Sequence, residues 1–159
     1  EGVIEPQATF SACFGSPFMP LHPTKYAHML GKKMEEDNVN VWLINTGWSG
    51  GGYGIGERIK LKYTRAIIQA AMNDKLKNIK FIKHEIFGLN IPEHCPNVPP
   101  IILQPINTWD NKKQYIEKAK MLARLFQDNF KKISESKINH TNINQQQLEM
   151  ILKGGPNQF

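Results

Sequence analysis

The chain has 159 residues, 40% of them hydrophobic, and a formal net charge of +6. This length is enough for one compact core, and it is too short for two full-sized domains. The excess of basic residues favours an anionic partner, such as a nucleotide or a phosphorylated metabolite. The lysines concentrate in 112–132 at helical spacing, which indicates a solvated helix face, so no nucleic-acid partner is expected.

Two cysteines, Cys13 and Cys95, are too few for a disulfide framework and form no Cys-x-x-Cys motif. A reducing compartment is therefore expected, and we predict a cytosolic protein. Residues 1–6 lack the basic and apolar pattern of a signal peptide and contain no initiator Met. We expect the chain to start inside a larger protein. No apolar run approaches membrane-spanning length, so no membrane partner is expected.

The first part of the chain predicts a loop followed by a helix. Residues 1–22 are rich in Pro, Gly, Ser and aromatic residues and predict extended chain and loop. A helix is expected over 23–37, because a proline in the first turn costs little. Tyr26, Leu30 and Met34 recur every fourth residue and form its apolar stripe.

A strand, a glycine-dense loop and a second helix are expected next. Residues 39–45 are β-branched and aromatic, and their apolar centre suits a strand covered on both faces. Residues 47–56 form the loop, and Thr64 or a near neighbour is expected to cap a helix that ends near Asn73. The buried side of this helix is predicted to consist of Ala66, Ile67, Ala70 and Ala71.

The remaining elements are a short strand, a connection and a long helix. Residues 79–82 predict an exposed strand, and the prolines of 90–106 predict a turn-rich connection. A helix is expected over 110–132 with Asp110 as its N-cap. Its apolar side is predicted to consist of Tyr115, Ala119, Leu122, Leu125, Phe126 and Phe130.

The composition changes to Asn, Gln, Ser and Lys after residue 134. We therefore predict two parts, a folded part at 1–133 and a polar, mobile or weakly helical tail at 134–159. The alternation of helices and strands predicts an α/β or α+β fold.

The glycine-dense loop fails the strict tests for a phosphate loop. A Walker-type loop requires Gly-x-x-x-x-Gly-Lys-Ser/Thr, whereas Gly51 and Gly56 are followed by Glu57 and Arg58. No register of the segment fits Gly-x-Gly-x-x-Gly. Glycine spacing alone therefore favours a flexible surface loop.

Three residues beyond this loop could form part of a binding site. The planar guanidinium of Arg58 could stack on a base or bind a phosphate. Ile59 could form a wall against a flat ring, and Thr64 could hydrogen-bond a ring nitrogen. From the residue types alone, a surface arginine, a core isoleucine and an N-cap threonine are the better explanation.

No catalytic or metal-binding residue is assigned. The five histidines are scattered, and no three or four of them have ligand spacing with Cys, Asp or Glu. Ser11 lies in no Gly-x-Ser-x-Gly motif, so a nucleophilic serine is not indicated.

Several blocks of sequence resemble the ATP-dependent phosphoenolpyruvate carboxykinases and occur in that family's order. The resemblance covers about residues 5–132. The blocks are 8–15 (ATFSACFG), 20–27 (PLHPTKYA), 41–48 (VWLINTGW), 56–59 (GERI), 63–68 (YTRAII), 86–89 (IFGL), 91–92 (IP), 95–99 (CPNVP) and 107–109 (NTW).

The resemblance implies a reaction that converts oxaloacetate and ATP to phosphoenolpyruvate, carbon dioxide and ADP, with magnesium and usually manganese, in gluconeogenesis. It implies an α/β fold in which this chain is part of the C-terminal mononucleotide-binding domain, in an enzyme that could form homo-oligomers. Arg58, Ile59 and Thr64 match positions that contact ATP in the family. Residues 2–5 match a stretch near a mobile active-site lid.

Other parts of the family pattern have no match in this chain. The phosphate loop, the metal-binding residues and the oxaloacetate-binding arginines precede the matched region in the family. Phosphoryl transfer depends on positioning and on charge neutralisation by such groups, so the chain alone is expected to be inactive. The alternatives are a non-catalytic nucleotide- or partner-binding module and, third, a basic RNA-binding domain with strongly salt-dependent affinity.

Overall fold

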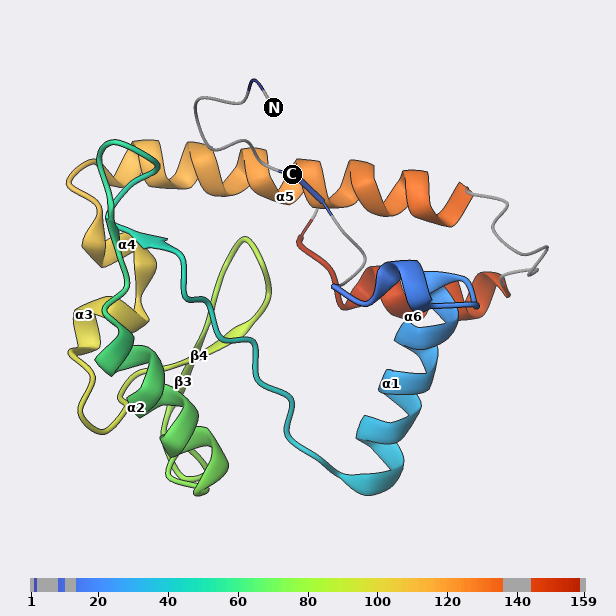
Figure 1. Ribbon diagram of the computed structural model, residues 1–159, viewed down its shortest axis with the longest axis horizontal. Coiled ribbons are helices and arrows are strands. Elements are labelled where there is room, and N and C mark those ends of the chain that lie inside the picture. The colour runs from blue at the N-terminus through green and yellow to red at the C-terminus, as the bar shows by residue number, and fades with distance from the viewer. Residues whose placement is uncertain (1, 3–8, 11–13, 136–143, 158–159) are drawn as a thin grey trace. The chain divides into compact units, whose positions relative to one another are not determined.

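A computed structural model describes residues 2, 9–10, 14–135 and 144–157 (Figure 1). The described residues form helices and two small antiparallel sheets, which confirms the predicted mixture of α and β structure. They belong to two compact units, one made of Glu1–Val41 with Ala123–Gln158 and the other of Trp42–Leu122. The division into 1–133 and 134–159 stays a prediction. No described helix is long and apolar enough to cross a membrane.

Helix α1, Pro23–Asp37, has the predicted bounds. Nδ1 of the fully buried His22 accepts a hydrogen bond from the Thr24 amide at 3.3 Å and caps the helix. Nε2 of His22 donates to the Ile133 carbonyl at 3.0 Å, in the same unit. The helix ends at Asn38, whose left-handed backbone (φ 47°) stops further helical hydrogen bonding.

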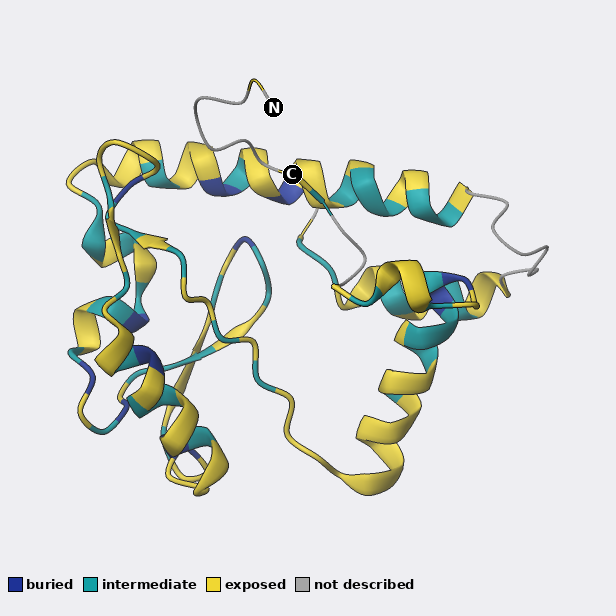
Figure 2. Ribbon diagram, viewed as in Figure 1, coloured by how far each residue is buried: buried dark blue, intermediate teal, exposed yellow. Residues whose placement is uncertain are grey.

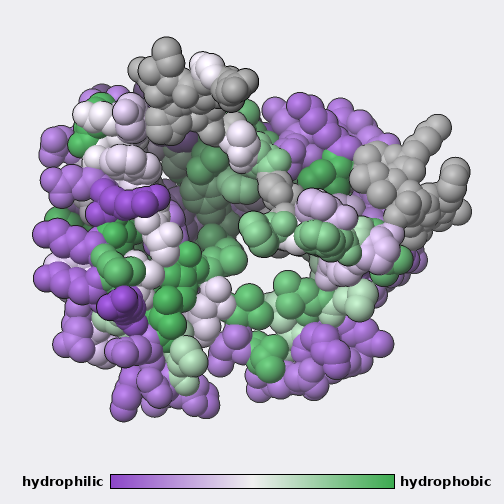
Figure 3. Space-filling view, in the orientation of Figure 1, coloured by the Kyte–Doolittle hydropathy of each residue, from purple (hydrophilic) through white to green (hydrophobic). Residues whose placement is uncertain are grey.

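The predicted apolar stripe of α1 is largely at the surface of the described residues. Leu30 is 53% exposed and Met34 is 38% exposed. Helix α6, Gln145–Lys153, contacts α1, and the Asn144 side chain caps it by accepting from the Gln146 amide at 2.9 Å. The predicted polar tail therefore contains a helix. Hydrophobic residues are also visible on the molecular surface (Figure 3).

The prediction of a strand at 39–45 is wrong for this structure, in which the segment is coil between α1 and the first sheet (Figure 1). A strand requires a neighbouring strand to accept and donate its backbone hydrogen bonds. No described segment pairs with it. Val41 is 47% exposed and Leu43 is 78% exposed, and the exposure of the segment is visible in Figure 2.

Helix α2, Leu61–Met72, begins before the predicted cap. Lys60 is the N-cap residue, and its carbonyl accepts hydrogen bonds from the amides of Tyr63 and Thr64. Thr64 is therefore inside the first turn, where it is buried. Asn73 ends the helix as predicted, since its amide and its side chain both donate to the Gln69 carbonyl.

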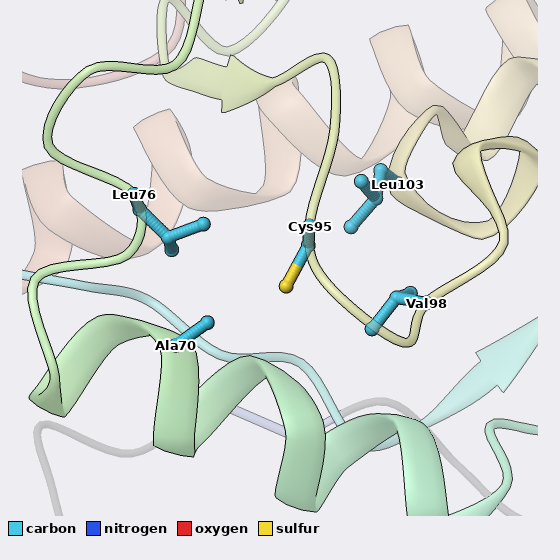
Figure 4. Packing of buried hydrophobic residues seen from close by; sticks show 5 residues of the cluster. All are labelled: Ala70, Leu76, Cys95, Val98 and Leu103. Carbon is cyan, nitrogen blue, oxygen red and sulfur yellow. The ribbon is translucent and has the colours of Figure 1, made fainter.

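The second unit has a small core built on the predicted side of α2. Ala66, Ile67 and Ala71 pack against this cluster and are partly buried. The cluster draws together residues that are far apart in the sequence, because small alanines allow the turns after α2 to approach the helix. Its buried members are Ala70, Leu76, Cys95, Val98 and Leu103 (Figure 4).

The strand predicted at 79–82 begins two residues later and ends one residue later in the structure. Strand β3, Phe81–Lys83, pairs antiparallel with β4, Asn90–Pro92, which lies in the predicted turn-rich connection. The connection also contains two single-turn helices, α3 (Pro100–Leu103) and α4 (Pro105–Thr108). Each of these helices begins with a proline, Pro100 or Pro105, from the stretch that was predicted to form turns.

Helix α5, Lys112–Glu135, is the predicted long helix. Asn111, not Asp110, caps it: Oδ1 of Asn111 accepts from the Gln114 amide at 3.1 Å. Ala119 and Ala123 are its buried residues, and the second of these was not among the predicted apolar positions. Larger predicted residues, including Leu122 and Phe126, are more than a third exposed.

Candidate functional site

The glycine-dense loop connects the two strands of a short hairpin in the second unit, and each strand has two residues. Strand β1, Trp48–Ser49, pairs antiparallel with β2, Glu57–Arg58, and Trp48 lies opposite Arg58. The Ile59 amide extends the pairing by donating to the Gly47 carbonyl at 3.0 Å. The position of Arg58 is therefore set by the hairpin, which the sequence did not predict.

Glycines are required where the hairpin loop turns back on itself. A Cβ at Gly56 would lie 2.3 Å from the Gly51 carbonyl oxygen and 2.7 Å from that of Ser49. Neither backbone atom can move without opening the hairpin. Gly50 has a φ of +81°, a conformation that residues with a side chain rarely adopt. The loop is thus a compact turn rather than an unstructured segment.

A threonine from α4 holds the beginning of this loop. The Gly50 amide donates to Thr108 Oγ1 at 3.0 Å, and the same hydroxyl donates to the Pro105 carbonyl at 2.7 Å. The loop lies close to α4 in Figure 1. A Cβ at Gly50 would lie 3.1 Å from the Thr108 carbonyl oxygen, so this approach also depends on glycine.

An open hollow of about 360 Å³ lies between the β1–β2 hairpin and helices α2, α3 and α4. This volume lies near the lower limit for small-molecule sites. The hairpin contributes Glu57 and Arg58, and the start of α2 contributes Lys60. Thr108 and Asp110 line the hollow from α4 and the residues after it. All of these residues belong to the second unit.

Two of the three predicted binding residues line this hollow and the third does not. Arg58 and Ile59 are in its wall. Thr64 is 6% exposed within α2 and is not in the wall, whereas its neighbour Tyr63 is. In the described part of the chain, no ion pair or hydrogen bond occupies the exposed Arg58 guanidinium, so it is available to a ligand.

The charges of the hollow are balanced. Arg58 and Lys60 supply two cations, and Glu57 and Asp110 supply two carboxylates. A balanced wall with apolar residues suits a polar heterocycle and its sugar better than a highly charged polyphosphate. Sequence reasoning missed Lys60, Tyr63, Thr108 and Asp110. The only signal for Thr108 was its place in the block 107–109.

A partly buried pair of polar side chains, His84 and Tyr115, lies beyond this wall. Nδ1 of His84 accepts from the amides of Ile86 and Phe87 at 3.2 and 3.3 Å, so Nε2 carries the proton and donates to the Tyr115 hydroxyl at 2.7 Å. Burial lowers the pKa of His84, against a smaller raising effect of Glu85. Burial raises the pKa of the Tyr115 hydroxyl. Both residues are therefore neutral at physiological pH.

The described residues do not provide a metal site. Among them, no three His, Cys, Asp or Glu side chains come together. The buried Cys95 is a free thiol whose pKa is raised by burial, as expected for a core residue rather than a nucleophile. Residues 3–5, which match a stretch near the lid in the resemblance, lie outside the described part of the chain, as does Cys13.

Comparison with known proteins gives consistent matches. The family model described as phosphoenolpyruvate carboxykinase matches residues 1–100. A protein of Flavobacterium johnsoniae named phosphoenolpyruvate carboxykinase (ATP) is 60% identical over 134 residues, which are 84% of this chain and 25% of that protein. A protein of Bacillus subtilis with the same name is 57% identical over 135 residues, 85% of this chain and 26% of that protein.

These matches include the hairpin and α2, and they extend past the region of the family model. The chain spans about a quarter of the length of the curated relatives that it matches. The family model covers more than half of the chain, and the identities are far above the level at which relatives share a fold. The chain belongs to the ATP-dependent phosphoenolpyruvate carboxykinase family.

Proposed function

We propose that this chain supplies one wall of the ATP site of a phosphoenolpyruvate carboxykinase and belongs to its C-terminal mononucleotide-binding domain. The whole protein would convert oxaloacetate and ATP to phosphoenolpyruvate, carbon dioxide and ADP. The observation that carries this proposal is the joint placement of Arg58 and Ile59 in the hollow at the hairpin exit. The names of the curated relatives support the reaction.

In this proposal the chain holds the adenosine end of ATP. Arg58 stacks on the base or binds a polar atom of the nucleotide, and Ile59 provides an apolar surface for the ring. Thr64 lies one turn into α2 and is buried, so it acts at the base only if the wall opens toward it. The balanced charge of the hollow fits a nucleoside rather than the triphosphate.

The chemistry would require groups outside the described residues. Magnesium and manganese neutralise charge on the phosphates in this family, and no described cluster could hold either ion. We therefore expect no turnover and weak or no ATP binding by this chain alone. In the whole protein, Arg58 and Ile59 orient the nucleotide so that its phosphates reach those groups.

The Arg58→Ala substitution in the whole-length protein tests this function. A charge-assisted hydrogen bond contributes about 1.5–3 kcal/mol, so the Michaelis constant for ATP should rise tenfold or more. The Michaelis constant for oxaloacetate should change little. Arg65→Ala is a matched control, because Arg65 is exposed on α2 and does not line the hollow.

Unchanged ATP kinetics in the Arg58→Ala protein would contradict the proposal. The rival hypothesis is a non-catalytic nucleotide- or partner-binding module. The sequence that precedes this chain in the whole protein distinguishes it from the enzyme. A Gly-x-x-x-x-Gly-Lys-Thr motif there favours the enzyme, because its lysine would bind the phosphates. A protein without such a motif and without turnover would favour the module.

A further inference from the structure

A single hydrogen bond joins the loop that leads to Arg58 to another element of the described structure. Within 50–56, the amides of Ile55 and Gly56 both donate to the Gly52 carbonyl, at 3.1 and 2.9 Å. These bonds close the loop on itself. Among the described residues, the bond from the Gly50 amide to Thr108 Oγ1 is the one that joins this loop to another element.

The Thr108 hydroxyl is oriented for this task. Because its proton is donated to the Pro105 carbonyl at 2.7 Å, a lone pair remains for the Gly50 amide. The γ-methyl group and the i−3 bond limit the side-chain rotamers. Thr108 therefore presents a fixed acceptor rather than a freely rotating hydroxyl.

The backbone that carries Thr108 is itself fixed. The Lys112 ammonium donates to the carbonyls of Ile106 and Trp109, at 2.6 and 3.0 Å, on either side of Thr108. The Trp109 ring packs edge-on against the Tyr115 ring at 5.7 Å, and Tyr115 accepts the hydrogen bond from His84. The acceptor of the loop is thus anchored to α5 and to the β3–β4 hairpin.

We propose that Thr108 is a positioning residue for the nucleotide wall, acting through Gly50. Its hydroxyl fixes the start of the loop, and the β1–β2 ladder transmits that position to Arg58, opposite Trp48. Without the hydroxyl, the loop has several arrangements and Arg58 meets the nucleotide in only some of them. The apparent affinity for ATP then falls in proportion to the fraction of molecules in which Arg58 is correctly placed. This inference rests on the proposed function.

The test uses the whole-length protein with Thr108→Val, which keeps the shape and removes the acceptor, and Thr108→Ser, which restores it. The Michaelis constant for ATP should rise about five-fold in Thr108→Val, with the turnover number within about twofold of wild type. Thr108→Ser should be within about twofold of wild type in both. Hydrogen exchange of peptides that cover 48–58 should accelerate in Thr108→Val and not in Thr108→Ser.

A second pair of variants tests the same bond from the loop side. Gly50→Ala should also raise the Michaelis constant for ATP, because its Cβ would press on the Thr108 carbonyl and its φ is unfavourable. Gly52→Ala is the matched control, since a Cβ there meets nothing within 4 Å.

Arg58→Ala separates the two proposals. If Arg58→Ala raises the Michaelis constant for ATP and Thr108→Val leaves it unchanged, the positioning role is overturned and the proposed function remains. If neither substitution changes it, both fall. If Thr108→Val and Thr108→Ser lower turnover and both substrate affinities equally, Thr108 has only a general structural role and the inference is overturned.

Discussion

Two neighbouring segments of the chain differ in how their backbone is satisfied. The loop at 50–56 closes on the β1–β2 hairpin and is held by Thr108. The segment at 39–45 has the stronger strand composition, yet it lies extended without a pairing strand among the described residues. Sequence patterns alone favoured order in the second segment and flexibility in the first.

The difference shows that order follows the availability of partners. The hairpin finds its partners within eleven positions of the chain, from Trp48 to Arg58, and so it forms locally. A strand such as 39–45 needs a distant neighbour to bind its amides and carbonyls. The relatives are about four times longer than the matched region, so such a neighbour can come from sequence outside this chain.

The largest effect is expected in the core of the second unit. Leu76 is 1% exposed in the buried cluster, so Leu76→Ala should lower the free energy of unfolding by about 3 kcal/mol. Leu43→Ala is the contrast within the unpaired segment and should cost less than about 0.5 kcal/mol in this chain. Urea denaturation followed by tryptophan fluorescence measures both. Equal costs would show that the Leu43 side chain is packed.

The next effect concerns the hairpin. Gly56→Ala should destabilise the second unit by about 2 kcal/mol, because its Cβ would overlap the backbone oxygens of Gly51 and Ser49. The hairpin should open, and exchange of its amides should accelerate. Gly52→Ala meets no neighbour and should differ from wild type by less than about 0.5 kcal/mol. Similar protection in both variants would mean that the hairpin is not closed as described.

A smaller effect should depend on pH. Burial lowers the pKa of His84 below its ordinary value of 6.5, so the unfolded chain binds a proton first as pH falls. The stabilisation is complete above pH 6.5 and is lost as pH falls through the lowered pKa. Protonation of Nδ1 would oppose the Ile86 and Phe87 amides. The urea midpoint, measured between pH 7.5 and 5, should decline less in His84→Asn; an identical decline would exclude His84 as its source.

The smallest effect on stability should accompany a change in association. Leu43→Glu alters an exposed side chain, so the free energy of unfolding should change by less than about 0.5 kcal/mol. Because an unpaired apolar strand favours pairing with another chain, the charge should reduce self-association. Light scattering coupled to size-exclusion chromatography would compare the molar masses of the wild-type chain and the Leu43→Glu variant. A monomeric wild-type chain at high concentration would contradict this prediction.

Local features of the fold were predictable from the sequence. The bounds of α1 followed from Pro23 and Asn38, and the buried side of α2 followed from its alanines. Errors arose at the helix caps, where more than one nearby residue could begin the helix. Thr64 has the residue type of a cap but lies inside α2, and Asn111 rather than Asp110 caps α5. Several residue types can cap a helix, so the sequence alone does not choose between neighbours.

For the candidate site, the sequence by itself determined the family blocks, the basic and apolar character of Arg58 and Ile59, and the absence of a Walker pattern in the glycine loop. Only the tertiary structure decided that the loop closes on a hairpin, that Thr108 reaches Gly50, and that Thr64 is buried away from the hollow. The physical reason is that helices and turns are specified by neighbours along the chain. A binding wall is specified by residues that folding alone brings within hydrogen-bonding distance.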